Sequence, residues 1–276
     1  YSSNYQSLTP DVFALRGYFN MDEIDKMALE NIAPGNTDGS KYSKFTLQNC
    51  DIETVRVPGI INSGILFNGV GNYALYDVNN YIDFNIMSSE AANLSVNIWV
   101  KMPSNVEVDS HYTLITNGVD FSNNGCRYEL ALVDTNSNGS MYLAATLSSN
   151  ITTNVAVVDN TVVLNDNEWH NVGFTLGKPN GASGPGNVSL CLDGVKIASG
   201  VLSGAFDSSS YIDNNQVYLG TSNGNANFYR GYLDELRIYN KELSDVEVAT
   251  LYNYGRDRKS TRLNSSHEWI SRMPSS

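Results

Sequence analysis

Residues 231–252 read GYLDELRIYNKELSDVEVATLY, and they describe a strand that is followed by a short helix. The first ten residues, 231–240, are rich in apolar and aromatic side chains and have the length of a strand. Ser244 can cap the N-terminus of a helix, and Glu247 three residues later completes a capping box. We expect this helix to end near Tyr252, and it is the only helix that the sequence predicts firmly.

Outward from this stretch, strand-like segments recur at short spacing. The clearest is LSVNIWVKM at 94–102, where apolar and other residues alternate. Clusters of Gly, Asn, Ser and Pro separate the segments, as turns do. The remaining segments are 12–19, 63–69, 127–133, 140–147, 155–164, 169–177, 187–199 and 216–222. This pattern predicts an all-β fold, a two-sheet antiparallel β-sandwich of the jelly-roll type with one short C-terminal helix.

The alternation also predicts which side chains fill the core. Trp99 lies on the opposite side of its strand from Leu94 and Val96, so partial exposure of Trp99 is the alternative outcome. The predicted core residues are Trp99, Trp169, Phe174, Leu190, Leu233, Leu236 and Ile238.

Composition limits the partners. The chain has 17 Lys and Arg against 29 Asp and Glu, a formal net charge of −12. Nucleic acid is therefore not expected as a partner, because phosphate binding needs Lys and Arg. Membrane insertion is not expected either, because no apolar run approaches the roughly 20 residues of a membrane helix. Among the three cysteines, a buried free Cys191 is the simplest interpretation, and a Cys50–Cys126 bridge stays open.

Both ends of the chain read differently from its middle. Residues 1–11 are polar and unpatterned, which favours a linker from an upstream region missing from this sequence. Residues 12–256 contain no linker-like break and are expected to form one domain. Residues 257–276, DRKSTRLNSSHEWISRMPSS, resemble one reading frame of a sequencing-library adapter. We expect this tail to be non-native and disordered, and its deletion to leave the melting temperature unchanged.

Several blocks in order resemble the laminin-G-like family of the concanavalin A-like lectin/glucanase superfamily. The blocks are RGYFNMDE (16–23), VPGIINSGILFNGVGNYALY (57–76), LSVNIWVKM (94–102), NDNEWHNVGFTL (165–176), VSLCLDGVKI (188–197) and the stretch at 231–252. One departure is Cys191, where relatives often have an aromatic residue. The resemblance implies a jelly roll of two curved sheets that binds sugars, mediates adhesion or serves as an accessory module.

The resemblance also implies a structural calcium ion in many members. Asp22 and Asp234 are the candidate ligands, because the family's first and last strands lie side by side and each acid follows or lies in one of them. Loop oxygens suit Ca²⁺, which takes six to eight of them. The alternative is that these carboxylates cap turns or pair with Arg16 or Arg237.

A sugar site needs an aromatic ring face beside polar groups, and one loop offers both. In TSNGNANFYRG at 221–231, Tyr229 would stack on a sugar, and Asn225, Asn227 and Arg230 would bind its hydroxyl groups. The loop at 117–128 is a second choice.

A catalytic site is not expected. Retaining glucanases of the same fold place two carboxyl groups about 5 Å apart on one strand. The acidic segment that begins at Glu23 has its next glutamate, Glu30, at the wrong spacing for that arrangement.

The sequence therefore predicts a non-catalytic, lectin-like carbohydrate-binding module of a larger extracellular or surface protein. Its expected partner is a glycan or polysaccharide. One alternative is a structural or adhesion domain that contacts protein, including a viral or phage surface protein. A divergent glycoside hydrolase is the remaining alternative.

Overall fold

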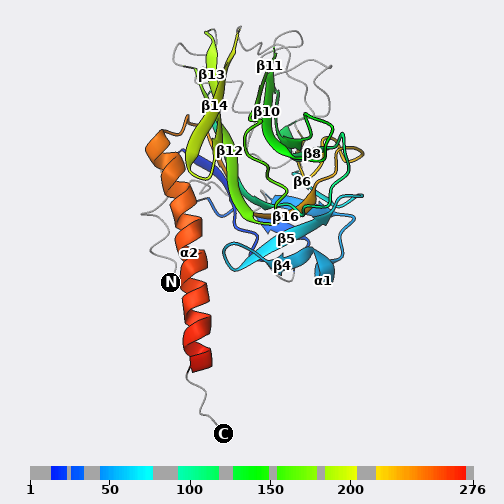
Figure 1. The fold of residues 1–276 in the computed structure, drawn as a ribbon, viewed down its shortest axis with the longest axis vertical. Coiled ribbons are helices and arrows are strands. Elements are labelled where there is room, and N and C mark those ends of the chain that lie inside the picture. The colour runs from blue at the N-terminus through cyan, green and yellow to red at the C-terminus, as the bar shows by residue number, and fades with distance from the viewer. Residues whose placement is uncertain are drawn as a thin grey trace.

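The computed structural model describes residues 14–23, 26–33, 44–76, 93–117, 127–148, 154–178, 184–203 and 216–271, with side chains to residue 258 in the last helix. Two antiparallel sheets of eight strands each form a sandwich, and a long helix runs along one side (Figure 1). The predicted all-β sandwich is confirmed. The expected linker at 1–11 lies outside the described residues.

The first sheet, sheet A, has the order β14-β13-β12-β7-β16-β5-β4, and β1 pairs with β16. The segment at 231–240 therefore lies at the centre of the sheet, which explains why it is so informative. The strands of sheet A are β1 (Leu15–Phe19), β4 (Arg56–Pro58), β5 (Ser63–Asn68), β7 (Leu94–Lys101), β12 (Trp169–Gly177), β13 (Gly186–Leu192), β14 (Val195–Leu202) and β16 (Arg230–Tyr239).

The second sheet, sheet B, has the order β11-β10-β9-β8-β15-β6-β3-β2. Its strands are β2 (Ala28–Glu30), β3 (Lys44–Gln48), β6 (Tyr73–Tyr76), β8 (His111–Asn117), β9 (Arg127–Val133), β10 (Tyr142–Ser148), β11 (Asn154–Val158) and β15 (Val217–Leu219). A four-residue helix, α1 (Ile52–Val55), precedes β4, and Asp51 caps it.

The main core lies between the sheets. The inner face of sheet A, which points toward sheet B, contributes the predicted core residues Phe174, Leu190, Leu233, Leu236 and Ile238, all fully buried. Trp99 is buried as well, but on the opposite, outer face of sheet A, in a cluster with Ile60, Ile61 and Tyr254.

Trp169 was expected in the core and is only half-buried. It begins β12 on the outer face, where it pairs in register with Lys101 at the end of β7. A strand end on that face leaves one side of the ring open, so the prediction for Trp169 is wrong.

The outer face of sheet A is covered by the first turns of helix α2 (Asp245–Ser271). Leu243, Val248 and Leu251 pack there against Tyr239 and Cys191. The predicted capping box is confirmed, because the Ser244 backbone N–H donates to Glu247 Oε2 at 2.8 Å and the Glu247 N–H donates back to Ser244 Oγ at 3.4 Å.

The helix does not end at Tyr252, and residues 257–271 are helical instead of disordered. Residues 256–271 contain neither glycine nor proline, so nothing in the backbone chemistry interrupts the helix before that point. Figure 1 shows its second half projecting beyond the sandwich. Cys50 and Cys191 are free thiols, and Cys126 lies outside the described residues.

Candidate functional site

The predicted sugar loop divides between two surfaces. Tyr229 has no exposed area, and its hydroxyl group donates to the Lys101 backbone oxygen at 3.2 Å. Burial raises the pKa of this phenol far above its usual range. The ring has no face left for a ligand, so the prediction that Tyr229 stacks on a sugar is wrong.

The other three predicted residues are accessible. Asn225 and Asn227 are exposed, and Arg230 is partly exposed. Arg230 Nη1 donates to the Asn105 backbone oxygen at 2.9 Å, which fixes the direction of the guanidinium group. Arg230 therefore stays a candidate for binding sugar hydroxyl groups. The second-choice loop at 117–128 lies almost wholly outside the described residues.

Arg230 lines a groove of about 540 Å³ at the edge of the sandwich. The groove lies beside β5 and the first residues of β16, and most of the residues that line it are polar. The lining residues are Asn49, Asp51, Thr54, Leu66, Phe67, Asn68, Asn72, Pro103, Asn167, Arg230, Gly231 and Tyr232. Four asparagines, one arginine and one tyrosine in a concave site match the chemistry of sugar hydroxyl groups, which both donate and accept hydrogen bonds.

Local turn chemistry builds one wall of this groove. Asn68 Oδ1 accepts the backbone N–H groups of Val70, Gly71 and Asn72, at 2.9, 3.2 and 3.3 Å. Gly69 has a φ of +79°, and a Cβ there would lie 2.8 Å from Arg230 Cβ. The loop therefore packs closely against Arg230 only because residue 69 is glycine. The Asn68-Gly69 pair is typical of a turn, but a turn pair by itself indicates no role in binding.

Tyr232 supplies the aromatic part of the groove. Its ring is half-buried, lies 6.2 Å from the Trp169 ring in an edge-on arrangement, and has Lys101 Nζ 5.7 Å from its centroid. These contacts hold the ring in place without covering it fully. Sequence reasoning missed Tyr232 because the residue belongs to the central strand, where a core role is the default expectation.

A second aromatic cluster lies near the loop residues Asn225 and Asn227. The Tyr73 and Phe228 rings are 6.3 Å apart, and the Tyr73 and Tyr218 rings are 6.2 Å apart. Tyr73 and Phe228 are partly exposed, whereas Tyr218 is buried. Phe228 thus has the accessible ring that the prediction assigned to its neighbour Tyr229.

The described carboxyl groups do not form a glucanase site in this groove. Asp51 is the one acid in the groove lining, and it caps α1 by accepting the Glu53 N–H at 3.0 Å. Glu23 lies elsewhere and accepts the Glu30 backbone N–H at 3.2 Å. Retaining and inverting hydrolases both place a pair of carboxyl groups across the scissile bond, whereas the described lining of this groove contains one carboxyl group.

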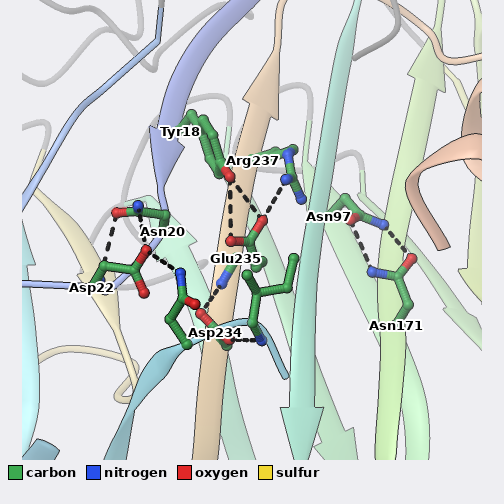
Figure 2. A network of polar contacts seen from close by, with 10 residues as sticks. Tyr18, Asn20, Asp22, Asn97, Asn171, Asp234, Glu235 and Arg237 are labelled. Atoms are coloured by element: carbon green, nitrogen blue, oxygen red, sulfur yellow. Dashed lines mark hydrogen bonds and ion pairs between the residues drawn. The ribbon is translucent and has the colours of Figure 1, made fainter. Parts of the chain in front are cut away.

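The two candidate calcium ligands approach the outer face of sheet A from different segments (Figure 2). Asp22 accepts from the Ser63 backbone at 3.1 Å and from the Asn20 and Asn62 amides at 2.8 and 3.0 Å. Asp234 accepts from the Ile61 and Glu235 backbones at 3.1 and 2.8 Å.

These two carboxylates offer fewer oxygens than the six to eight that calcium takes, and N–H donors already occupy them. Among the residues that the structure describes, no group of three or more His, Cys, Asp and Glu gathers to hold a metal. The calcium ion stays a prediction that requires a direct experiment.

Electrostatics at this point favour added positive charge. Burial first, and then the neighbouring charges of Glu235 and Asp22, raise the pKa of Asp234 well above its usual range. Burial also raises the pKa of Glu235, although Arg237 opposes this effect. Figure 2 shows Tyr18 and Arg237 both directed at Glu235, so that carboxylate is held by its own partners.

Several of the solved structures with a similar fold are binding domains. The binding domain of Paraclostridial Mosquitocidal Protein 1 is 16% identical, with a TM-score of 0.61. The binding domain of botulinum neurotoxin DC in complex with SialylT is 14% identical, with a TM-score of 0.58. In each comparison 88% of this chain covers 52% of the other, so the chain spans about half the length of these structures.

A third structure matches over nearly its whole length. Domain 4 of AbnA, a GH43 extracellular arabinanase from Geobacillus stearothermophilus, was solved in complex with arabinotriose. It is 19% identical, with a TM-score of 0.57, and the match covers 86% of this chain and 98% of that one. At these identities the structures show a shared fold and nothing finer.

Sequence comparison identifies the family. No curated protein matches the chain. In the described residues no helix is long and apolar enough to cross a membrane. The family model Laminin_G_3, of the concanavalin A-like lectin/glucanases superfamily, matches residues 77–249, which is more than half of the chain. The chain therefore belongs to the laminin-G-like family of the concanavalin A-like superfamily, as its strand order and its segment at 231–252 indicate.

Proposed function

We propose that this domain is a non-catalytic module that binds neutral polysaccharide in the groove beside β5 and β16. The observation that carries the proposal is the groove lining, in which asparagine amides, Arg230 and the half-buried ring of Tyr232 line one concave surface. Concave sites with a few fixed polar groups and an aromatic wall are the usual form of small-ligand and sugar sites.

Charge supports a neutral ligand. The lining contains one cation, Arg230, and one anion, Asp51, so neither a strongly acidic nor a strongly basic ligand is favoured. The chain's net charge of −12 also disfavours polyanions at long range.

The similar structures support a binding role in a larger extracellular or surface protein. One of them is a domain of an extracellular arabinanase that holds arabinotriose, and others are binding domains of toxins, one of them bound to a protein, rat synaptotagmin II. Arabinan is therefore the first polysaccharide to test, and a protein surface is the alternative partner.

The test is isothermal titration of soluble arabinan, xylan, hydroxyethyl cellulose and mannan into the purified domain, with Arg230→Ala and Tyr232→Ala as variants. Arg256→Ala is the matched control, because Arg256 is an exposed arginine on α2 outside the groove. We expect one of the polysaccharides to bind in the micromolar to millimolar range. Arg230→Ala should weaken binding about ten-fold or more, since a hydrogen bond to a charged group contributes about 1.5–3 kcal/mol. Tyr232→Ala should also weaken binding, because it removes the aromatic wall of the groove.

A reducing-sugar assay on the same polysaccharides should detect no product. Release of reducing ends would overturn the non-catalytic part of the proposal. If none of the polysaccharides binds at millimolar concentration, the carbohydrate proposal is abandoned and the adhesion alternative takes its place.

A further inference from the structure

Two separate chain segments connect the groove with the aromatic cluster of Tyr73, Tyr218 and Phe228. In the first segment Asn72 lines the groove and the next residue, Tyr73, belongs to the cluster. In the second segment Phe228 belongs to the cluster and Arg230 lines the groove. The two surfaces are therefore neighbours along both segments.

The backbone of the second segment places two of its side chains, those of Phe228 and Arg230, on the same side of the chain. Its backbone bonds to neighbouring strands, since the Asn227 oxygen accepts the Thr113 N–H at 3.0 Å and the Tyr229 N–H donates to the Gly220 oxygen at 2.9 Å. Successive side chains of an extended chain point to opposite sides, and Tyr229 points into the core. Phe228 and Arg230 hence both point outward, roughly 7 Å apart along the backbone.

The rings are held firmly. Tyr73 packs against both Phe228 and Tyr218, at interplanar angles of 42° and 41°, and the Tyr218 hydroxyl group donates to Gln216 Oε1 at 2.5 Å. Asn225 and Asn227 are exposed in the same loop, so hydrogen-bonding groups lie close by in the chain. Partly exposed rings with neighbouring amides repeat the chemistry of the groove.

We propose that this domain binds the interior of a polysaccharide chain across two contiguous subsites, and not a single terminal sugar. The first is the groove with Arg230 and Tyr232, and the second is the ring subsite formed by Tyr73 and Phe228, with Asn225 and Asn227 as its polar contacts. This inference rests on the proposed function. Once the groove holds one part of a chain, contact with the ring subsite is intramolecular, so two shallow subsites give useful affinity together.

The experiment compares short and long oligosaccharides by isothermal titration. The probes are arabinotriose with arabinohexaose, xylotriose with xylohexaose, cellotriose with cellohexaose, and mannotriose with mannohexaose. The variants are Tyr73→Leu and Phe228→Leu in the ring subsite and Arg230→Ala in the groove, each with its melting temperature measured. Leucine keeps apolar contact with Tyr218 while it removes the flat ring.

For the series that binds, the hexamer should bind the wild-type domain about ten-fold more tightly than the trimer. A hexamer offers several overlapping trimers, and this statistical factor persists in every variant. In the ring variants the affinity for the trimer should be unchanged. The affinity for the hexamer should fall until it exceeds that for the trimer by no more than the statistical factor. Arg230→Ala should weaken trimer and hexamer alike.

Three results would overturn the inference. A hexamer that binds the wild-type domain more tightly than the trimer by no more than this statistical factor would show that the groove acts alone, and the proposed function would stand. The same would follow if the ring variants kept both the wild-type melting temperature and the full preference for the hexamer. If no oligosaccharide and no polysaccharide bound, the proposed function and this inference would fall together.

Discussion

The two faces of sheet A are both buried, but they are built from different chemistry. The inner face packs aliphatic and aromatic side chains against sheet B, with members such as Val96, Ile98 and Ile238. The outer face, under α2, buries a hydrogen-bonded pair of asparagines, Asn97 and Asn171, and the Glu235–Arg237 ion pair. Strands β7 and β16 thus each contribute to an apolar core on one side and to a polar network on the other.

The buried polar groups of the outer face are less completely hydrogen-bonded than those of the inner face. Among the described residues, several buried polar atoms on or against this face have no hydrogen-bond partner within the protein. They are Trp99 Nε1, Arg237 Nε and Nη1, Tyr239 Oη and Thr175 Oγ1. A buried polar group without a partner costs about 1–3 kcal/mol. The stability of the outer face therefore depends on each of its remaining polar partners.

Arg237→Met should produce the largest effect, because it leaves the Glu235 carboxylate buried without its cation. Both side chains are about 1% exposed. Removal of one partner of a buried pair costs about 3–5 kcal/mol, which urea denaturation measures. The neighbouring inner-face change Ile238→Val is the control and should cost about 0.5–1.5 kcal/mol. A smaller loss for Arg237→Met than for Ile238→Val would show that the network contributes nothing.

Calcium tests whether the surplus of negative charge on the outer face attracts a cation. Addition of Ca²⁺ to a metal-stripped sample should raise the melting temperature, since a cation would favour the charged form of Asp234, whose pKa is raised by burial and then by the charges of Glu235 and Asp22. Binding to the native state alone adds about 2.7 kcal/mol at a hundredfold excess over Kd. Asp22→Asn should abolish this response. Identical melting with EDTA and with millimolar calcium would show that hydrogen bonds alone join Asp22 and Asp234 to this face.

Gly255→Ala probes how closely α2 approaches the outer face. A Cβ at Gly255 would lie 2.5 Å from Trp99 Cζ2, so the helix or the indole ring must move. Overpacking of this kind costs about 1–3 kcal/mol, against a gain in helix propensity of about 1 kcal/mol. We expect a net loss of stability by thermal denaturation. Asn253→Ala, at an exposed position of the same turn, is the control. Stabilisation by Gly255→Ala would mean that the contact with Trp99 is loose.

The comparison of the two faces also explains what sequence reasoning could reach. Alternation in β7 and β12 predicted the inner core, because Val96, Ile98 and Phe174 obey a period of two. It did not predict that the outer face is covered, because α2 comes from a distant part of the chain. Trp99 was for that reason placed in the core without its actual neighbours.

In β16 the spacing of apolar residues contained a signal that was not used. Leu233 and Leu236 are three residues apart, and Ile238 follows after two, which a regular strand cannot place on one face. The structure resolves this with an irregularity between Asp234 and Arg237, where Glu235 has a φ of +55°. Such a bulge brings two acids, Asp234 and Glu235, onto the outer face together.

For the candidate site, composition predicted the kind of surface but not the residues. The loop at 221–231 was correctly considered for its aromatic and amide side chains, yet only the strand pairing decides that Tyr229 points inward and Phe228 and Arg230 point outward. The groove joins Asn68 to Arg230, residues far apart in the sequence. No local pattern could have brought them together.

His170, near the start of β12, should make a pH-dependent contribution to the stability of the domain. Nδ1 lies 2.8 Å from Asp193 and Nε2 lies 3.2 Å from Asp166. Burial lowers the pKa of His170, but the bonds and charges of both aspartates outweigh it, so the pKa is raised above 6.5. Because the folded state binds the proton more tightly, this stabilisation is complete below pH 6.5 and is lost as pH rises through the raised value.

The contribution should not exceed about 1 kcal/mol, as for other ion pairs near the surface. Urea denaturation between pH 5 and pH 9 should show it in the wild type and not in His170→Gln. A His170→Gln variant with the wild-type pH profile would assign the dependence to other groups.

Truncation of α2 should have the smallest effect on the melting temperature. It shows how far along the helix the stabilising contacts with the outer face extend. Tyr254 is the last residue of α2 that belongs to a buried cluster of this face, and the Arg258 guanidinium lies 4.8 Å from the centre of its ring. A chain that ends at Arg258 should melt like the full chain. A chain that ends at Arg256 also loses this cation–π contact, which contributes about 0.5–1 kcal/mol at an exposed position. Loss of more than that from removal of residues 259–276 would show that the projecting half of the helix packs on the domain after all.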